Sequence, residues 1–413
     1  MSARILKRKK VTHLDVGISI IKKLYEEGFT AYFAGGWVRD FLMDHPSDDI
    51  DIATDASVED VQKIFPKTIP VGVNFGIVIV VEEGHHFEVA TFRKDQGYKD
   101  GRRPIGVEKA DPEEDAERRD FTINGMFYDP IKKNLYDYIG GQEDLKKGII
   151  RAIGNPHERF LEDRLRMIRA VRYASRFHFL IENETLKAIL DHADDLFPAV
   201  AIERVWNEFS KMALFPNFDR ALVILQRLNL LPVIFPALRE VSTEEIEKRV
   251  VKLPHFPEDA PIISRILELF PSASLEDRKA LCSYLKLSNQ DIRFVETYHH
   301  AIEIFLSKKD KELYEWAHFY ANPLYPICLK IAAIHFPLDE RQTFLQEHHM
   351  RCDLLEKAIH KIQNKTPFLS SSDLKKAGIA PGPEMGALLK QAERIAINEN
   401  LDSPKEILKK LSL

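Results

Sequence analysis

Two aspartates separated by one residue, after a glycine turn and a short helical segment, constrain the fold of this chain most. The pattern predicts a strand over Thr30–Gly35, a helix over Val38–Met43 and a strand over Asp49–Ala53. Because side chains alternate along a strand, we expect Asp49 and Asp51 to leave the same face and to share a divalent metal ion. A surface strand with two solvated acids would show the same pattern, so other residues must decide between these interpretations.

Length and composition indicate several ordinary globular domains. A chain of 413 residues with 45% hydrophobic and 30% charged residues is too long for one core, and we expect about two to four domains. No run approaches the roughly 20 apolar residues that a membrane helix needs, and the basic start is unlike a signal peptide, so we expect a cytosolic protein. The scattered cysteines Cys282, Cys328 and Cys352 predict reduced structural thiols and no zinc site.

The distribution of charge is more informative than its sum. The formal net charge of -5 argues against a uniformly basic nucleic-acid binder. Between Arg151 and Leu180, however, seven arginines stand against three acidic residues. Clustered arginine suits phosphate, because a planar guanidinium donates to two oxygens at once. The segment therefore predicts an anion-binding face, although a solvated helix face would have a similar composition.

The front of the chain is predicted to contain a small mixed sheet. Gly76–Val81 and His86–Phe92 are rich in β-branched and aromatic residues, and the Glu-Glu-Gly sequence between them predicts a hairpin. Glu88, on the second of these strands, would add a third carboxylate beside the aspartate pair. Such an oxygen-rich cage suits two Mg²⁺ ions. The polar segment Lys94–Arg118 has no sustained apolar periodicity, and we expect a long mobile loop there.

After a strand and turn over Tyr136–Gly141, the pattern becomes helical and stays so to the end. Apolar residues recur at helical spacing in five segments, Phe160–Phe177, Glu203–Leu214, Phe218–Leu228, Ala260–Leu269 and Leu313–Ala321. Breaks near Pro216, Pro254–Pro261 and Pro367 are the expected boundaries. The predicted fold class is therefore α+β, with a sheet-containing front and an all-helical rear.

Two further groups of residues point to nucleotide chemistry. Gly36 in the glycine turn and Arg39 one helical turn later could hold a triphosphate through backbone N–H groups and a guanidinium. Arg119, Asp120 and Asn124, directly after the polar segment, offer donors for phosphate and acceptors for a ribose hydroxyl. A charged helix start would also explain the second group.

One acid and three arginines recur at intervals of three residues from Asp163 through Arg166 and Arg169 to Arg172. If this segment is one helix, they form a single ridge. Such a ridge could select adenine and cytosine, because the carboxylate accepts from an exocyclic amine while a guanidinium donates to a ring nitrogen or carbonyl. Salt bridges within the helix are the alternative. Arg204, near the start of a later helix, is expected to brace neighbouring helices.

These motifs, in this order, resemble those of the class II tRNA nucleotidyltransferases, the CCA-adding enzymes and bacterial poly(A) polymerases of the polymerase β-like superfamily. The similarity covers roughly Gly35 to Met212. It is weaker in the rest of the chain, where it rests mostly on the turn Gly378–Gly386. It is carried by Gly35-Gly36-Trp37-Val38-Arg39-Asp40, Asp49-Ile50-Asp51, Arg118 to Asn124, Gly140-Gly141, and Glu162-Asp163 with Arg166.

The resemblance implies both a site and an architecture. Asp49 and Asp51 would bind the catalytic metal, with Glu88 as third carboxylate, and Asp163 with Arg166 would pair with the base. The other implied nucleotide contacts are Gly36, Arg39, Arg119, Asp120, Arg169 and Arg172. The family fold is a seahorse with a catalytic head at 1–150, a base-recognising neck at 151–215, a helical body at 216–345 and a tRNA-binding tail at 346–413.

The implied activity is template-independent addition of CCA to tRNA 3′ ends from CTP and ATP with Mg²⁺, and no obligate protein partner is evident. Poly(A) synthesis, addition of CC or A alone, and a catalytically silent RNA-binding protein are the alternatives. The segment Val71–Gly76 lacks the basic run of poly(A) polymerases, which favours tRNA repair. Asp95, Tyr98, Asp100 and Arg102 match members that add the terminal A, and their segment is the expected place for the pocket to adjust between nucleotides.

Overall fold

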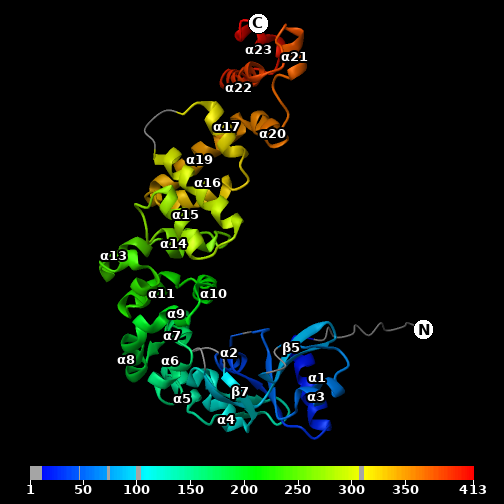
Figure 1. Ribbon diagram of the computed structural model, residues 1–413, viewed down its shortest axis with the longest axis vertical. Helices are drawn as coiled ribbons and strands as arrows, with labels where there is room; N and C mark the ends of the chain where they lie inside the picture. Colours follow the sequence, from blue (N-terminus) through cyan, green and yellow to red (C-terminus); the bar gives the residue numbers. More distant parts are fainter. Residues whose placement is uncertain (1–11, 46, 72–74, 99–103, 307–310) are drawn as a thin grey trace, which may run out of the picture. The chain divides into compact units, whose positions relative to one another are not determined.

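The structure is a computed structural model that describes residues 12–45, 47–71, 75–98, 104–306 and 311–413 (Figure 1). The chain divides into two compact units, Met1–Ile246 and Glu247–Leu413. The division between the units falls inside the range predicted for the body. The four-part arrangement of head, neck, body and tail stays a prediction.

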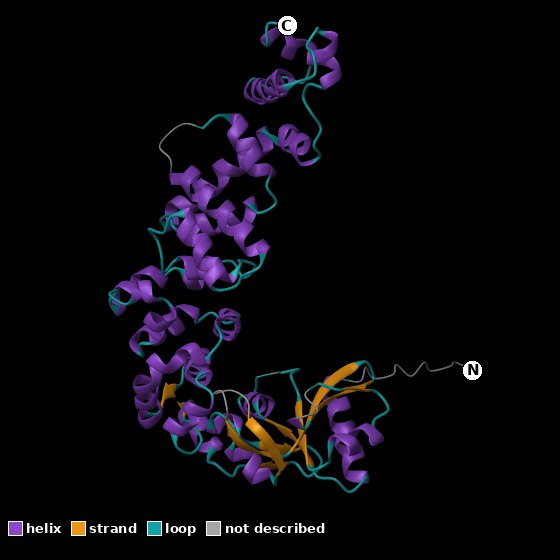
Figure 2. Cartoon of the chain, viewed as in Figure 1, coloured by secondary structure: helices purple, strands orange, loops and turns teal. Residues whose placement is uncertain are grey.

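The first unit contains a sheet of seven strands in the order β3-β4-β5-β2-β1-β8-β9 (Figure 2). The strands are β1 Ala31–Ala34, β2 Asp51–Thr54, β3 Thr68–Ile69, β4 Ile77–Glu82, β5 His85–Thr91, β8 Phe127–Asp129 and β9 Asn134–Tyr136. Among the described strands of this sheet, β2 and β5 form the one parallel pair. The expected mixed sheet is therefore present, and β2 is its central strand.

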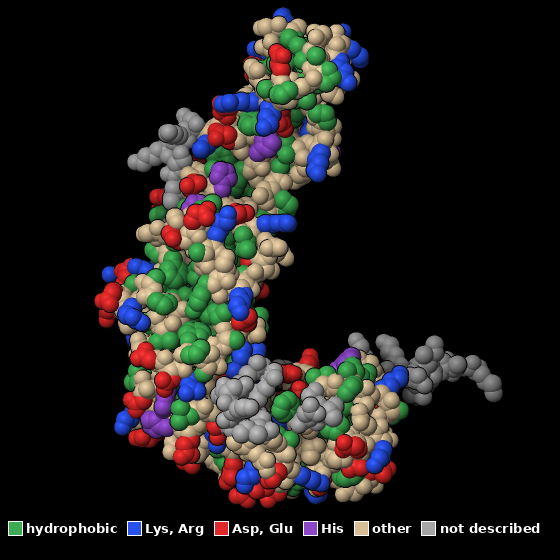
Figure 3. Space-filling model, in the orientation of Figure 1, with side chains coloured by type: hydrophobic (Ala, Val, Ile, Leu, Met, Phe, Trp, Pro, Cys, Tyr) green, Lys and Arg blue, Asp and Glu red, His purple; other side chains and the backbone are tan. Residues whose placement is uncertain are grey.

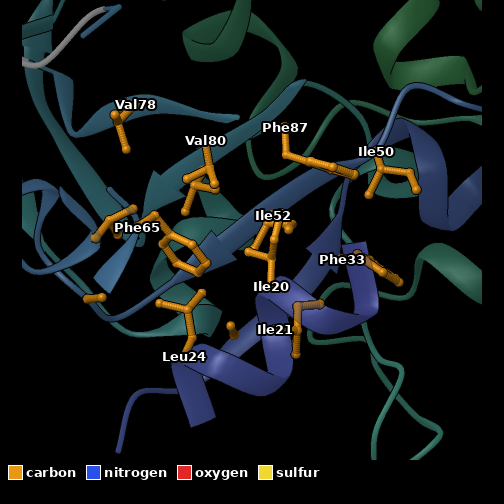
Figure 4. Packing of buried hydrophobic residues seen from close by; sticks show 14 of the residues in the cluster. Ile20, Ile21, Leu24, Phe33, Ile50, Ile52, Phe65, Val78, Val80 and Phe87 are labelled. Carbon is orange, nitrogen blue, oxygen red and sulfur yellow. The ribbon is translucent and has the colours of Figure 1, made fainter. Parts of the chain in front are cut away.

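Helices α1 (His13–Glu26) and α3 (Val58–Ile64) supply apolar side chains to the core on one side of the sheet. A capping box between Thr12 and Asp15 fixes the start of α1. The cluster shown in Figure 4 includes Ile20, Ile21, Leu24, Phe33, Ile50, Ile52, Phe65, Val78, Val80 and Phe87. Ala53, one residue after Ile52, belongs to a separate cluster. Because side chains alternate along β2, Asp51 lies on the face of the sheet that points away from α1.

The predicted hairpin between β4 and β5 is confirmed. The two strands pair antiparallel, with Glu82 opposite His85. The two connecting residues, Glu83 and Gly84, both have positive φ, at 49° and 82°. This is the backbone of the tight turns that match the twist of a hairpin.

The prediction of a mobile loop over Lys94–Arg118 is wrong. Strands β6 (Arg93–Tyr98) and β7 (Pro104–Lys109) pair antiparallel, and helix α4 (Pro112–Glu117) follows them. A two-stranded ribbon outside the main sheet satisfies its backbone groups without burying one face, so a polar sequence can form it. Asp111 caps α4 in a capping box with Glu114. Two residues of the predicted A-adding pattern, Asp100 and Arg102, lie outside the described residues, as do residues 72–74.

The rest of the first unit is mainly helical, as expected. Its helices are α5 Gly141–Lys147, α6 Pro156–Glu162, α7 Leu165–Phe177, α8 Asn183–His192, α9 Leu196–Ala199, α10 Ile202–Ala213, α11 Phe218–Arg227 and α12 Leu230–Ile234. A parallel pair of two-residue strands, β10 (Ile149–Ile150) and β11 (Leu180–Ile181), interrupts them.

The single helix predicted over Phe160–Phe177 is wrong, because the chain leaves α6 at Asp163 and enters α7 at Leu165. Asp163 is extended, with φ -151° and ψ 103°. Its carboxylate accepts a hydrogen bond of 3.1 Å from the backbone N–H of Leu165. The side chain therefore stabilises the start of α7, as a capping residue does.

The described residues of the second unit contain helices and no strand. Helix α13 (Thr243–Val250) spans the boundary between the units. The remaining helices are α14 Ile262–Leu267, α15 Leu275–Tyr284, α16 Asn289–Leu306, α17 Leu313–Ala321, α18 Tyr325–Ile334, α19 Leu338–Leu354, α20 Glu356–Gln363, α21 Ser371–Lys376, α22 Pro383–Asn398 and α23 Pro404–Lys410. The turn at Gly378 joins α21 to α22, as the sequence predicts.

The surface and the thiols agree with an ordinary globular protein. On the face drawn in Figure 3, acidic and basic side chains are interspersed. Within the described ranges, no helix combines the length and the apolarity that crossing a bilayer requires. Cys282 and Cys328 are buried and Cys352 is partly exposed, and all three are free thiols.

Candidate active site

The site begins at the turn between β1 and α2 (Gly36–Leu42). Gly35 caps α2 with φ 65° and ψ -130°, a conformation that only glycine adopts at low cost. A Cβ atom at Gly35 would lie 3.0 Å from Nη1 of Arg119. The glycine therefore lets an arginine from a distant segment approach the backbone of the turn.

Asp51 is the first residue of β2 and pairs with a neighbour on each side, Ala34 of β1 and Glu88 of β5. In a parallel pair, register partners project from the same face, so the side chains of Asp51 and Glu88 are adjacent. Asp49 lies two residues before the strand and is exposed. The expected strand over Asp49–Ala53 is therefore too long, because strand pairing starts only at Asp51.

The three predicted catalytic carboxylates are electrostatically coupled. Burial and the charges of Glu88 and Asp49 together raise the pKa of Asp51 to about 7, and Arg119 opposes them. A carboxyl group that resists ionisation beside two other carboxylates has the environment of a cation site, because a bound cation removes the repulsion. Within the described part of the chain, no group of three acidic, histidine or cysteine side chains converges closely enough to form a ready metal site. The donor set fits Mg²⁺ in chemistry, and the side chains must move together to hold it.

A large polar pocket of about 740 Å³ opens beside these residues. Of the eleven residues predicted for the site, all except Glu88 line it: Gly36, Arg39, Asp49, Asp51, Arg119, Asp120, Asp163, Arg166, Arg169 and Arg172. Nine basic residues line the pocket against five aspartates, so it is suited to a polyanion.

Asp120 bridges two parts of the first unit. Its Oδ2 accepts from Nε and Nη2 of Arg169 on α7, at 2.8 and 2.5 Å, and its Oδ1 accepts from Nδ2 of Asn124 at 3.0 Å. Burial alone would raise the pKa of Asp120, but Arg169 and Asn124 outweigh burial and hold that pKa far below its usual range. Asp120 is therefore a fixed anion joining the segment after α4 to α7.

Arg39 is held from three sides. Its Nη1 donates to Oδ1 of Asn124 at 2.5 Å, and its Nε donates to Asp40 at 2.8 Å. Its guanidinium carbon lies 5.1 and 4.8 Å from the ring centres of Tyr173 and Phe177 on α7. At 3% exposure, Arg39 is a rigid wall of the pocket rather than a mobile surface cation.

The four-residue ridge predicted from Asp163 is wrong at its first member, since Asp163 lies in the break between α6 and α7. Its Oδ2 accepts from Nη2 of Arg204 on α10 at 2.7 Å. Arg204 thus braces α10 against this break, as the sequence suggests. Arg166 donates to Oε2 of Glu162 at 2.5 Å and to the carbonyl oxygen of Arg159 at 2.8 Å.

Arg172, the last of the predicted arginines on α7, is buried. Its Nε donates to Oε2 of Glu208 on α10 at 2.6 Å, and its guanidinium carbon lies 4.2 Å from the ring centre of Tyr173. The arginines of α7 that the sequence assigns to nucleotide are thus also tied to neighbouring elements. These contacts with neighbouring elements were not predicted.

Asp115 is a further residue of this site, and it was not among the predicted residues. This carboxylate is 1% exposed and accepts hydrogen bonds from both Arg118 and Arg119, at 2.8 Å each. It orients Arg119 toward the glycine turn. The signal was present, because Asp115 stands three and four residues before the arginines, which is salt-bridge spacing on a helix. The prediction of a loop over that segment hid it.

A mixed sheet with adjacent carboxylates on its central strands, a glycine turn and an arginine-lined pocket defines a nucleotidyltransferase. Two family models match the chain, described as "Poly A polymerase head domain" over residues 31–151 and "Probable RNA and SrmB- binding site of polymerase A" over residues 178–241.

Curated relatives span nearly the whole chain. A CCA-adding enzyme of Ligilactobacillus salivarius is 36% identical, with 95% of this chain and 94% of the relative covered. A CCA-adding enzyme of Streptococcus mutans is 31% identical, with coverage of 95% and 94%. The chain therefore belongs to the family of CCA-adding enzymes, the nucleotidyltransferases that extend tRNA.

A solved structure agrees with this membership. The crystal structure of the Bacillus stearothermophilus CCA-adding enzyme in complex with CTP has a TM-score of 0.75 and 27% identity, and 98% of each chain is covered. The family resemblance and the α+β fold that the sequence predicts are confirmed. The family is metal-dependent, and Mg²⁺ is its typical ion.

Proposed function

We propose that this chain adds CCA to the 3′ end of tRNA, using CTP and ATP as donors and no nucleic-acid template. One observation carries the proposal: the register pair of Asp51 and Glu88 stands beside a pocket of about 740 Å³ lined by arginines of the first unit. In the reaction the 3′-hydroxyl of the RNA attacks the α-phosphorus of the nucleotide, the new phosphodiester forms, and pyrophosphate leaves.

Asp49, Asp51 and Glu88 are the proposed metal-binding carboxylates, and two Mg²⁺ ions are the proposed occupants. The raised pKa of Asp51 supports this role, since burial and the charges of Glu88 and Asp49 disfavour its ionised form, and a bound cation would favour that form. When bound, such ions lower the pKa of an attacking hydroxyl and neutralise the charge of the leaving phosphates. The two aspartates come from β2 and the residues just before it, and the glutamate comes from β5. Both strands can therefore contribute to holding the metal.

Gly36, Arg39 and Arg119 are the proposed contacts of the triphosphate. The backbone of the glycine turn is open to a close approach, and Arg119 stands directly beside it. Arg39 is fixed by Asn124, Asp40 and two aromatic rings, so it can meet a phosphate with little loss of side-chain entropy. A preorganised guanidinium suits the charge that develops during phosphoryl transfer.

Asp163 and Arg166 are the proposed readers of the base. A carboxylate has about four acceptor positions, and Asp163 uses two, one for Leu165 and one for Arg204. The remaining capacity can accept from the exocyclic amine that adenine and cytosine share. Arg204 would keep the carboxylate oriented while it does so.

Asp120, Arg169 and Arg172 complete the proposed nucleotide-binding face. All three line the pocket, yet each is engaged in an ion pair. Their proposed part is to hold the head strands and α7 at the separation that the nucleotide needs, with Arg169 as the most exposed of their side chains at 29%.

The remaining assignments follow the same proposal. The head would carry the chemistry, the neck would read the base, and the body and tail would bind tRNA. The ribbon of β6 and β7 is the proposed element that adjusts the pocket between nucleotides. A cytosolic location fits the proposed substrates.

Sequencing the 3′ ends made from tRNA that lacks its terminal CCA tests the activity. With CTP alone the product should end in CC, with both nucleotides in CCA, and with ATP alone nothing should be added to the shortened tRNA. Long adenylate tails would identify a poly(A) polymerase, and products that stop at CC or gain only A would identify a partial activity. An inactive protein that still binds tRNA would identify a silent RNA-binding protein.

A further inference from the structure

The second unit contains a pocket of about 350 Å³ that the nucleotidyl transfer does not use. It lies where α14, α15, α16 and α18 meet. Its walls are mainly apolar, from Leu267, Ile302, Phe305, Ala332 and Phe336. A cavity of this size and lining is within the ordinary range for small-molecule sites.

Two polar side chains at this pocket have unused hydrogen-bonding groups. Arg278 is 6% exposed and Tyr298 is 1% exposed. Among the described residues, neither Nη1 of Arg278 nor the hydroxyl of Tyr298 has a hydrogen-bond partner. A buried polar group without a partner is costly, and two such groups at one cavity indicate a ligand that satisfies them.

The chemistry of the two groups specifies an acceptor. The guanidinium only donates, and the phenol can donate to the same atom, so the matching group is an oxygen that accepts twice. Both side chains line the same pocket, so one ligand can reach both. Nε of Arg278 is already bound to the carbonyl oxygen of Ala273 at 3.1 Å, so the guanidinium is anchored at one end and free at the other.

The charge around the pocket favours an anion. Four basic residues line it, namely Lys248, Arg249, Lys252 and Arg278, against the single acid Glu268. Glu268 faces His335, whose Nε2 is 3.4 Å from its carboxylate, and it acts electrostatically on both Arg278 and Tyr298. The basic majority attracts an anion, and the mainly apolar walls favour a carboxylate that carries an apolar body over inorganic phosphate.

We propose that this pocket binds a small carboxylic acid with an apolar or aromatic body. The carboxylate accepts from Arg278 and Tyr298, and the body packs against the apolar walls. Both polar atoms are shielded from water, so binding includes a small rotation of these side chains that opens them to the pocket. The site belongs to the second unit alone and does not depend on the proposed nucleotide chemistry.

Calorimetric titration of the full-length protein with 3-phenylpropionate tests the proposal. We expect saturable binding below about 10 mM, the weak range that suits so small a probe. The alcohol 3-phenylpropanol, which keeps the body without the charge, and inorganic phosphate, which keeps charge without the body, should bind at least about tenfold more weakly. Equal binding of the alcohol, or no saturable binding of the acid, would overturn the proposal.

Tyr298→Phe is the decisive variant, because it removes only a hydroxyl that has no described partner. The variant should be at least as thermally stable as the parent protein, and it should bind 3-phenylpropionate about tenfold more weakly. Arg278→Met should abolish binding, and Tyr314→Phe, on α17 and outside the pocket, should change nothing. Unchanged affinity of Tyr298→Phe for 3-phenylpropionate would overturn the proposal. A variant that still binds the acid but has lost affinity for tRNA would also overturn it, since the pocket would then serve RNA.

Discussion

Asp51 and Glu88 occupy register-paired positions on the parallel strands β2 and β5, so two carboxylates that lie 37 positions apart in the chain stand side by side on one face of the sheet. The burial of Asp51 makes this proximity costly and raises its pKa to about 7. The fold therefore keeps an unfavourable concentration of acid in the head. Such a cost in free energy is expected at a functional site, where a bound ligand offsets it.

The first prediction follows from that cost. Asp51→Asn should abolish nucleotide addition and yet stabilise the metal-free protein. The pKa of Asp51 rises on folding, so between about pH 4 and pH 7 the folded chain holds a proton that the unfolded chain has released, and stability falls as pH rises through this window. Asparagine removes this penalty. The gain in unfolding free energy should be near zero at pH 4 and about 2 kcal/mol at pH 8, because solvent screens part of the full shift.

Chemical unfolding in EDTA at the two pH values measures this effect, and 3′-end analysis measures activity. Asp44→Asn is the matched control, since Asp44 is exposed in the same part of the head. Added Mg²⁺ should stabilise the parent protein and leave Asp51→Asn unaffected. A variant that is less stable than the parent in EDTA at pH 8, or one that stays active, would contradict the metal assignment.

The second prediction concerns Gly35. Gly35→Ala places a side chain on a backbone with positive φ and brings its Cβ to 3.0 Å from the guanidinium of Arg119. We expect a stability loss of about 1 to 2 kcal/mol and a fall of at least about 100-fold in kcat/KM, because a misplaced phosphate contact is costly in rate. Gly84→Ala is the control, because Gly84 also has a positive φ, at 82°, with open space around it. It should lose similar stability and keep its activity; equal loss of activity in both would show that Gly35 matters only for folding.

The third prediction concerns base selection. Asp163→Ala should reduce the preference of each addition step for its correct nucleotide by about 10- to 100-fold, the discrimination expected of a bidentate base contact. The ratio of kcat/KM for CTP and ATP on tRNA ending before each position measures it. Glu158→Gln, on the exposed surface of α6, is the control. A uniform loss for both nucleotides would mean that Asp163 serves only to hold Arg204 and the start of α7.

The parts of this site that could be predicted are those that depend on patterns among residues close together in the sequence. The alternating aspartates and the β-branched strands predicted the central strands and their acidic face, because strand periodicity is local. The ribbon of β6 and β7 was missed, since paired polar strands outside a core leave no apolar signal. The break at Asp163 was missed for a related reason: the apolar pattern continues in helical phase across it, and only the capping hydrogen bond reveals the change.

The pairings between distant residues could not be predicted at all. The sequence named both Asp120 and Arg169 as nucleotide-binding residues, but nothing in their local patterns shows that they bind each other across 49 positions. Each motif could be recognised from its own residues, whereas the ion pair depends on how α7 docks against the strands. The same holds for Arg172 with Glu208 and for Arg204 with Asp163.

That ion pair gives the fourth prediction, by a double-mutant cycle. Arg169→Met should cost about 3 kcal/mol of stability, because it leaves the buried carboxylate of Asp120 without its ion-pair partner. Asp120→Asn should cost less, because Arg169 is 29% exposed and keeps Glu208 at 4.0 Å. The double variant should recover at least about 1 kcal/mol of the sum. The pKa of Asp120 is lowered on folding, so its contribution is present above about pH 4 and is lost as pH falls further. Urea unfolding at pH 7 and pH 3 measures both effects. Additive costs, or an Asp120→Asn penalty that is no smaller at pH 3 than at pH 7, would show that Asp120 and Arg169 do not stabilise the fold as a charged pair.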